Sequence, residues 1–160
     1  MQPAQIQTLK TFVAASVDAA IVAARTAGAT YDLMNLLNAP NVPATSAWRV
    51  AVPAVDIDAA ANYTTYDTLT QGKRDEWDIF LKYAPRNMGL SKNRSVVTDV
   101  WGAALASSLS EAILLVCVEN ASVAEFALGG STKTTGTVSA LLRSFAGQVS
   151  QDDCVKILAP

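Results

Sequence analysis

The spacing of apolar residues predicts helices over most of the first 128 residues. In the opening segment, 5–27, apolar side chains recur at steps of three and four, and Gly28 follows as a helix terminator. A cap at Ser16 or Asp18 is the alternative that divides this segment into two helices. A short helix is expected over 30–38, because the X-Pro pairs that follow it disfavour helical backbone.

The middle of the chain shows the strongest helical period. Thr68 and Gln71 form a capping-box pattern, and Pro85 stops the helix that this pattern opens. Its buried face is expected to carry Trp77, Phe80, Leu81 and Ala84. A helix from about 93 is expected to bury Val97, Val100, Trp101, Ala104 and Leu105. A third helix, 108–128, opens on a second capping box, and its apolar centre predicts the most buried helix.

The last part of the chain differs in character. Gly129 and Gly130 are expected to end the third helix, and 131–137 reads as a polar, flexible loop. The segment 138–149 gives mixed signals, so an extended arm and a small β-hairpin remain alternatives there, before a short helix over 151–158. The predicted fold is therefore a mainly α, single-domain helical bundle. Residues 1–128 form its body and 129–160 a flexible arm with a short terminal helix.

The composition of the chain excludes several classes of function and says less about its fold. The 160 residues are 51% apolar and 16% charged, with a net charge of −2 and no histidine. Without histidine, the usual Ser-His-Asp and Cys-His nucleophilic sites and His-ligated metal sites are excluded. Two cysteines, Cys117 and Cys154, are too few for a Cys-only zinc site. The slightly acidic balance argues against sequence-independent nucleic-acid binding by the whole domain.

Two patterns suggest chemistry that their context does not support. GGSTKTTGT, at 129–137, lacks the glycine directly before the Lys-Thr pair that a phosphate-binding loop needs, and it follows a predicted helix. The carboxylates at 56/58, 75/76/78 and 152/153 are expected at helix starts, where anionic side chains meet free N–H groups. We therefore expect no catalytic residue, no metal site, no cofactor and no enzymatic activity.

The chain is not expected to enter a membrane. Its longest apolar run, 112–118, is far shorter than the ~18–20 residues of a membrane-spanning helix. The opening segment faintly resembles a signal peptide, but Asp18 stands in the middle of what would be its apolar centre.

One stretch of the chain is rich in cations. Lys82, Arg86, Lys92 and Arg94 surround a loop that has no acidic residue. They are the candidates for a surface that faces a polyanion, such as DNA passing through a channel. The alternative is a solvated loop together with a cation at a helix C-terminus.

A second set of residues is a candidate interface. Trp48 beside Arg49 would suit an interface anchor if exposed, because both residue types are enriched at binding hot spots. The predicted arm would reach a neighbouring subunit, and its candidate contact residues are Gly129, Gly130, Lys133 and Phe145.

An ordered series of motifs spans nearly the whole chain: QIQTLK, then NLLNAPNVPATSAWRVAVPAVDI, YDTLTQGKRDEWDIFL, and a Gly/Ser/Thr-rich loop before FAGQVSQDDCVKIL. This series resembles a family of uncharacterised proteins of similar length encoded by tailed bacteriophages and prophages. The matching positions are Asn38, Ala39, Pro40, Trp48, Arg49, Val52, Pro53, Gly147, Val149, Ser150, Asp153 and Val155. The chain departs from the pattern where Cys154 separates Asp153 from Val155, and where ALLRSF replaces a more strand-like run.

The resemblance implies a non-enzymatic virion structural protein, assembled in the cytoplasm of the bacterial host. The expected role is a head–tail connector (adaptor or neck) subunit that forms a homo-oligomeric ring on the portal. Its partners would be copies of itself, the portal and other neck and tail proteins, with a passing contact with DNA. The alternative is a capsid cement (decoration) protein or a tail-completion protein.

Overall fold

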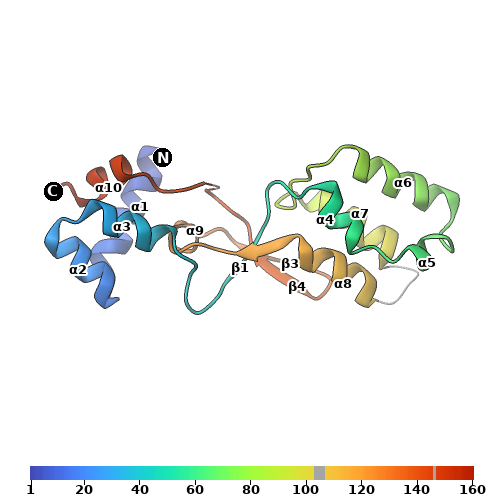
Figure 1. Ribbon diagram of the computed structural model, residues 1–160, viewed down its shortest axis with the longest axis horizontal. Coiled ribbons are helices and arrows are strands. Elements are labelled where there is room, and N and C mark those ends of the chain that lie inside the picture. The colour runs from blue at the N-terminus through green and yellow to red at the C-terminus, as the bar shows by residue number, and fades with distance from the viewer. Residues whose placement is uncertain (103–106, 146) are drawn as a thin grey trace. The chain divides into compact units, whose positions relative to one another are not determined.

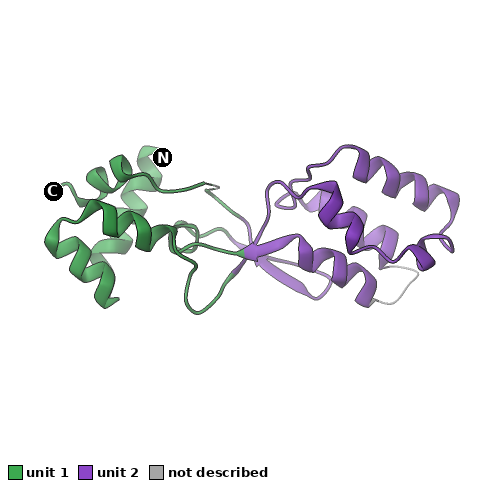
Figure 2. Ribbon diagram, viewed as in Figure 1, with its two compact units in different colours: residues 1–45, 120–130, 143–160 green, residues 46–119, 131–142 purple. Residues whose placement is uncertain are grey.

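The computed structural model describes residues 1–102, 107–145 and 147–160. These residues form two compact units, shown in different colours in Figure 2. Unit 1 comprises Met1–Thr45, Asn120–Gly130 and Arg143–Pro160, and unit 2 comprises Ser46–Glu119 and Ser131–Leu142. Neither unit is a continuous stretch of sequence, because the chain leaves unit 1 twice and returns to it twice.

Unit 1 consists of helices packed around one apolar core. Its helices are α1 (Pro3–Ala15), α2 (Ala19–Ala27), α3 (Thr30–Asn38), α9 (Val123–Leu128) and α10 (Gln151–Leu158) (Figure 1). Leu9, Leu33 and Leu37 are fully buried in the core, together with Cys154. Burial of a large aliphatic side chain contributes about 1.5–3 kcal/mol. Helices α1 and α3 therefore hold α10 through apolar contacts.

Helix boundaries in unit 1 follow local capping chemistry. The Asp18 side chain accepts hydrogen bonds from the backbone N–H groups of Ala20 and Ile21, which starts α2 and confirms the two-helix alternative for 5–27. Gly28, with φ of 63°, ends α2 in the left-handed conformation that glycine adopts most readily. The Ser150 hydroxyl accepts a hydrogen bond from the Asp153 N–H and begins α10, the short helix that the sequence predicts over 151–158.

Unit 2 combines helices with a sheet. Its helices are α4 (Ala54–Ala59), α5 (Tyr63–Tyr66), α6 (Gln71–Lys82), α7 (Ser91–Trp101) and α8 (Ser107–Val116). The strands are β1 (Ser46–Trp48), β2 (Val118–Asn120), β3 (Thr132–Thr135) and β4 (Val138–Leu141), in the order β2-β1-β4-β3. Strands β1 and β4 pair in parallel, whereas β3 and β4 form an antiparallel hairpin. The sheet is thus mixed, and all but Asn120 belongs to unit 2.

Aromatic side chains fill the core of unit 2. Trp48, Trp77 and Trp101 are all fully buried. The Trp77 ring meets Trp101 edge-on, at 5.2 Å between ring centroids, and stacks on Phe80 at 5.4 Å. Such aromatic pairs contribute about 0.5–1.5 kcal/mol beyond the area that they bury. Helices α6 and α7 are joined through these rings.

The prediction of a mainly α, all-helical bundle is wrong, because the described residues contain a four-stranded mixed sheet. Its strands are only three or four residues long, too short to display an alternating pattern, and β3 reads TKTT with mostly exposed side chains. The tail is not a flexible arm either. Val138 and Ala140 are buried in unit 2, while Val149 and Ile157 are buried in unit 1.

The continuous helix predicted over 108–128 is also wrong. Helix α8 ends at Val116, strand β2 follows, and α9 starts a new helix. Ser122 and Glu125 form a capping box at the start of α9, a signal present in the sequence and overlooked there. The capping box at Thr68 is displaced as well, since Thr70 is the N-cap of α6. Of the face predicted for the helix from 93, Ala104 and Leu105 lie outside the described residues.

Candidate functional site

A groove lies between α6 and α7 in unit 2. Its volume is about 620 Å³. Ile79, Phe80 and Val96 supply apolar lining, and the Arg86 and Lys92 side chains stand at the same surface. The remaining lining residues are Gly72, Asp75, Glu76 and Asn93. The groove therefore offers an apolar strip with charges of both signs along it.

Of the four cations predicted to face a polyanion, Arg86 is bonded to the C-terminal end of α6. Its Nε donates to the Phe80 carbonyl at 2.6 Å and its Nη2 to the Ile79 carbonyl at 3.0 Å. The guanidinium also lies 4.6 Å from the Phe80 ring centroid. Because a helix C-terminus carries partial negative charge, this cation stabilises the last turn of α6. Burial lowers the pKa of Arg86.

Arg94 is held inside unit 2. Only 5% of it is exposed, and its guanidinium lies 5.1 Å from the Trp48 ring centroid. Its Nη1 donates to the Met88 carbonyl and its Nε to Thr135 Oγ1. Burial lowers the pKa of Arg94. Lys82 and Lys92, in contrast, are exposed, so the structure divides the predicted cationic set into two structural and two surface residues.

The predicted interface residues are also separated. Trp48 is fully buried, so it is not an exposed anchor, and its Nε1 donates to the Lys133 carbonyl at 3.1 Å. Arg49 donates from Nη1 to Asp56 Oδ2 and to the Val116 carbonyl, both at 2.9 Å. Trp48, Arg49 and Lys133 thus lie in unit 2, with Lys133 exposed on β3. The predicted contacts placed in unit 1 are Gly129, Gly130 and Phe145, of which Phe145 packs against the core.

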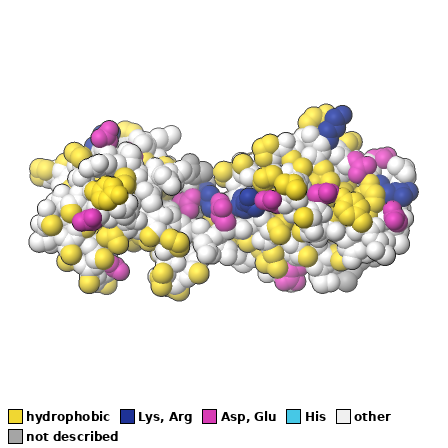
Figure 3. Space-filling view, viewed as in Figure 1, with side chains coloured by type: hydrophobic (Ala, Val, Ile, Leu, Met, Phe, Trp, Pro, Cys, Tyr) yellow, Lys and Arg dark blue, Asp and Glu magenta, His cyan; other side chains and the backbone are white. Residues whose placement is uncertain are grey.

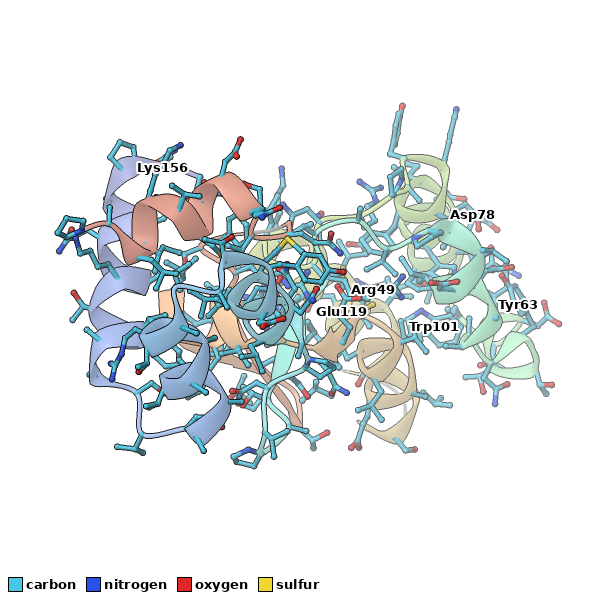
Figure 4. All side chains as sticks on the ribbon, turned by 60° about the vertical axis from the view of Figure 1, so that its left-hand side comes forward. Arg49, Tyr63, Asp78, Trp101, Glu119 and Lys156 are labelled. Carbon is cyan, nitrogen blue, oxygen red and sulfur yellow. The ribbon has the colours of Figure 1, made fainter. Side chains whose placement is uncertain are left out.

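The carboxylates of unit 2 accept hydrogen bonds from neighbouring side chains. The Tyr63 hydroxyl donates to Asp58, and the Tyr66 hydroxyl donates to Asp78 Oδ1 at 2.7 Å. Tyr63 and Asp78 are labelled in Figure 4. Burial and the Asp58 bond raise the pKa of Tyr63 to about 12, and the Asp78 bond with burial does the same for Tyr66. Asp78 lies well inside α6 and not at its start, so the helix-start explanation fails for that group.

Other reactive groups are withdrawn from solvent. Cys117 and Cys154 are buried free thiols, and burial raises their pKa values to about 12 and about 11. Thiolates at these positions are therefore disfavoured. Within the described residues, no group of three His, Cys, Asp or Glu side chains is placed to hold a metal ion.

No single helix in the described part of the chain has the length and hydropathy of a membrane span. Helices α1 and α2 reach the required length and hydropathy only when taken together, and they are bent by 109° at the break between them.

The exposed apolar side chains are the feature that the sequence pattern did not single out. In unit 2 they include Ile79, Tyr83 and Leu90 near the groove and Leu115 on α8. In unit 1 they include Val17, Tyr31, Val42, Phe126 and Val155. Hydrophobic side chains are spread over the visible surface of both units in Figure 3. These residues could have been found in the sequence as apolar residues outside the buried face of their helix. Ile79 is an example, because it is exposed while its neighbour Phe80 is buried.

Comparison with known proteins returns no relative. Neither a scan against protein-family models nor searches of curated proteins and of solved structures give a match to this chain. The phage-family resemblance therefore stays a prediction, and function is inferred from the surface and core of each unit.

Proposed function

We propose that this chain is a non-enzymatic structural subunit of a tailed-bacteriophage virion: a head–tail connector (adaptor or neck) protein that forms a homo-oligomeric ring on the portal. Its partners are other copies of the chain, the portal, and other neck and tail proteins. The proposal starts from the motif resemblance between 38 and 155.

The observation that carries the proposal is the exposure of large apolar side chains on units whose cores are already complete. Val17 and Val42 are 96% and 89% exposed in unit 1, and Tyr83 is 64% exposed in unit 2. None of these side chains is needed to fill its own core, because each unit buries a separate cluster. Apolar side chains left exposed in this way are available for contacts with neighbouring subunits, because the centre of a subunit interface is more apolar than the rest of the surface.

The distribution of charge fits the same role. Charged residues make up 16% of the chain, and Arg49, Arg86 and Arg94 are already bonded within unit 2. A subunit interface is favoured where few charges must be desolvated. Lys82 and Lys92 remain at the surface, where they would make any passing contact with DNA.

Quantitative mass spectrometry of purified phage particles tests this function. A connector is expected in every particle, at a copy number equal to that of one ring at the portal vertex. Absence from particles would overturn the virion role altogether. A copy number that scales with the capsid lattice would overturn the connector role and indicate a cement protein instead.

A further inference from the structure

Unit 2 carries an apolar groove on its α6–α7 side, with two cations and two carboxylates in its lining. Of the four cations between 79 and 94, Arg94 is buried and Arg86 donates to carbonyls of α6, so Lys82 and Lys92 are the exposed ones. Ile79, which is 56% exposed, lines the α6–α7 groove beside Phe80 and Val96, and Lys92 stands at its rim. The carboxylates at the other end of the groove already have partners: Lys73 pairs with Glu76 at 2.9 Å, and Gln71 donates to Asp75.

A second surface of unit 2, the outer face of α8, carries an exposed apolar side chain and one carboxylate. On the outer face of α8, Leu115 is 54% exposed, Ala112 is exposed, and Glu111 is half-buried one turn before Leu115. Residues i and i+4 lie on the same side of a helix, so Glu111 and Leu115 form one acidic, apolar stripe.

These two surfaces lie on different sides of the unit. Helix α7 packs against both α6 and α8, and α6 and α8 lie apart in Figure 1. The α8 stripe therefore cannot enter the groove of its own unit. Two copies of the chain can bring the stripe of one against the groove of the other, and a copy in the middle of a row uses both surfaces.

We propose that the chain self-associates head to tail, with the α8 stripe of one copy seated in the α6–α7 groove of the next. Leu115 occupies the apolar strip formed by Ile79, Phe80 and Val96, and Glu111 faces Lys92. A groove of about 620 Å³ has room for several side chains of one helix face. A heterologous contact of this kind closes into a ring when its rotation permits. This deepens the proposed function and rests on it for its setting in the virion.

Two full-length variants, each with one surface removed, provide the test. Ile79→Glu blocks the groove and leaves the α8 stripe intact, whereas Leu115→Lys blocks the stripe and leaves the groove intact. The expected result by analytical ultracentrifugation is that wild-type chain associates, each variant alone is monomeric, and their mixture forms a 1:1 dimer that grows no further. The matched control is Val155→Lys on α10, equally exposed at 54%, which associates like wild type.

Charge exchange gives a second, independent measurement. Lys92→Glu and Glu111→Lys are each expected to weaken association by about tenfold, and the double variant is expected to recover it. Circular dichroism establishes that each variant is folded. A monomeric wild-type chain at the highest soluble concentration, a mixture that stays monomeric, or a control that also dissociates would overturn the head-to-tail contact. None of these results depends on finding the chain in virions, so the proposed function fails or stands separately.

Discussion

At the scale of single residues, the partners of a side chain decide its role more than its type does. Arg94 and Lys92 are two residues apart in the sequence, yet Arg94 is buried over Trp48 and Lys92 is exposed at the groove. The sequence shows that four cations lie close together between 82 and 94. It does not show which of them are bonded within the unit and which are exposed, because the acceptors of Arg86 and Arg94 include backbone carbonyls, which every residue possesses.

Replacing Arg94 tests this division directly. Arg94→Ala is expected to lower the free energy of unfolding of unit 2 by about 2–3 kcal/mol, because it removes two hydrogen bonds from a buried charged group, to the Met88 carbonyl and to Thr135 Oγ1. Lys92→Ala is the matched control and is expected to change it by less than about 0.5 kcal/mol. Urea unfolding monitored by tryptophan fluorescence measures both. Equal effects of the two substitutions would contradict the structural role of Arg94.

Asp153 predicts how acid affects unit 1. Burial disfavours its charge, but hydrogen bonds from the Ser150 hydroxyl and N–H, together with the Met1 ammonium at 3.2 Å, outweigh burial and lower the pKa of Asp153. The unfolded chain therefore takes up this proton at a higher pH than the folded chain. The stabilisation is fully present above about pH 4, near the unfolded pKa, and it is lost as the pH falls through the lower, folded pKa.

Asp153→Asn removes this dependence and leaves the shape of the side chain. Unfolding free energies measured by denaturant titration from neutral pH to pH 3 are expected to fall more steeply for wild type than for the variant below about pH 4. Parallel curves over the whole range would show that the Asp153 charge does not stabilise the fold.

At the scale of elements, capping and periodicity predict helices well and short strands poorly. The apolar period places Trp77 and Phe80 in the core, and Asp18, Gly28 and Ser150 mark real helix ends. Strand β1 pairs with β4 across more than ninety residues, with Ala47 opposite Leu141. No local pattern encodes such a pairing in strands of three or four residues, so the sheet emerges only from the assembled unit.

Replacing two glycines by alanine tests the helix ends, because the two substitutions are expected to change stability in opposite directions. Gly28→Ala is expected to destabilise unit 1 by about 1 kcal/mol, because φ of 63° is strained for alanine even though the added methyl group meets no atom within 4 Å. Gly72→Ala, in the first turn of α6 and equally open, is expected to stabilise unit 2 by up to about 1 kcal/mol. Thermal unfolding of each variant gives the signs. A stabilising Gly28→Ala would contradict the left-handed cap.

At the scale of the whole molecule, two cores are built from interleaved parts of one chain. The last 32 residues contribute Val138 and Ala140 to unit 2, and Val149, Cys154 and Ile157 to unit 1. A division of the chain into a body, 1–128, and an arm, 129–160, therefore does not follow the packing. Sequence patterns favoured that division because the polar loop at 131–137 resembles a linker.

Truncation after residue 128 separates these two descriptions. The truncated chain is expected to lose the cooperative unfolding of both units, because it lacks β3 and β4 as well as α10. Near-UV circular dichroism and amide dispersion in NMR spectra measure that loss. If the truncated chain keeps native tertiary signals and unfolds cooperatively, the prediction that residues 1–128 form a helical body without the tail is correct.

We propose that the chain is a ring-forming subunit at the head–tail junction. The most direct test is cryo-electron microscopy of purified particles, reconstructed at the portal vertex without imposing the symmetry of the capsid. The expected result is a closed ring on the portal in which density for each subunit accommodates unit 1 and unit 2, with α8 of one subunit against the α6–α7 groove of its neighbour. Density for the chain spread over the capsid lattice, or none at the junction, would contradict it.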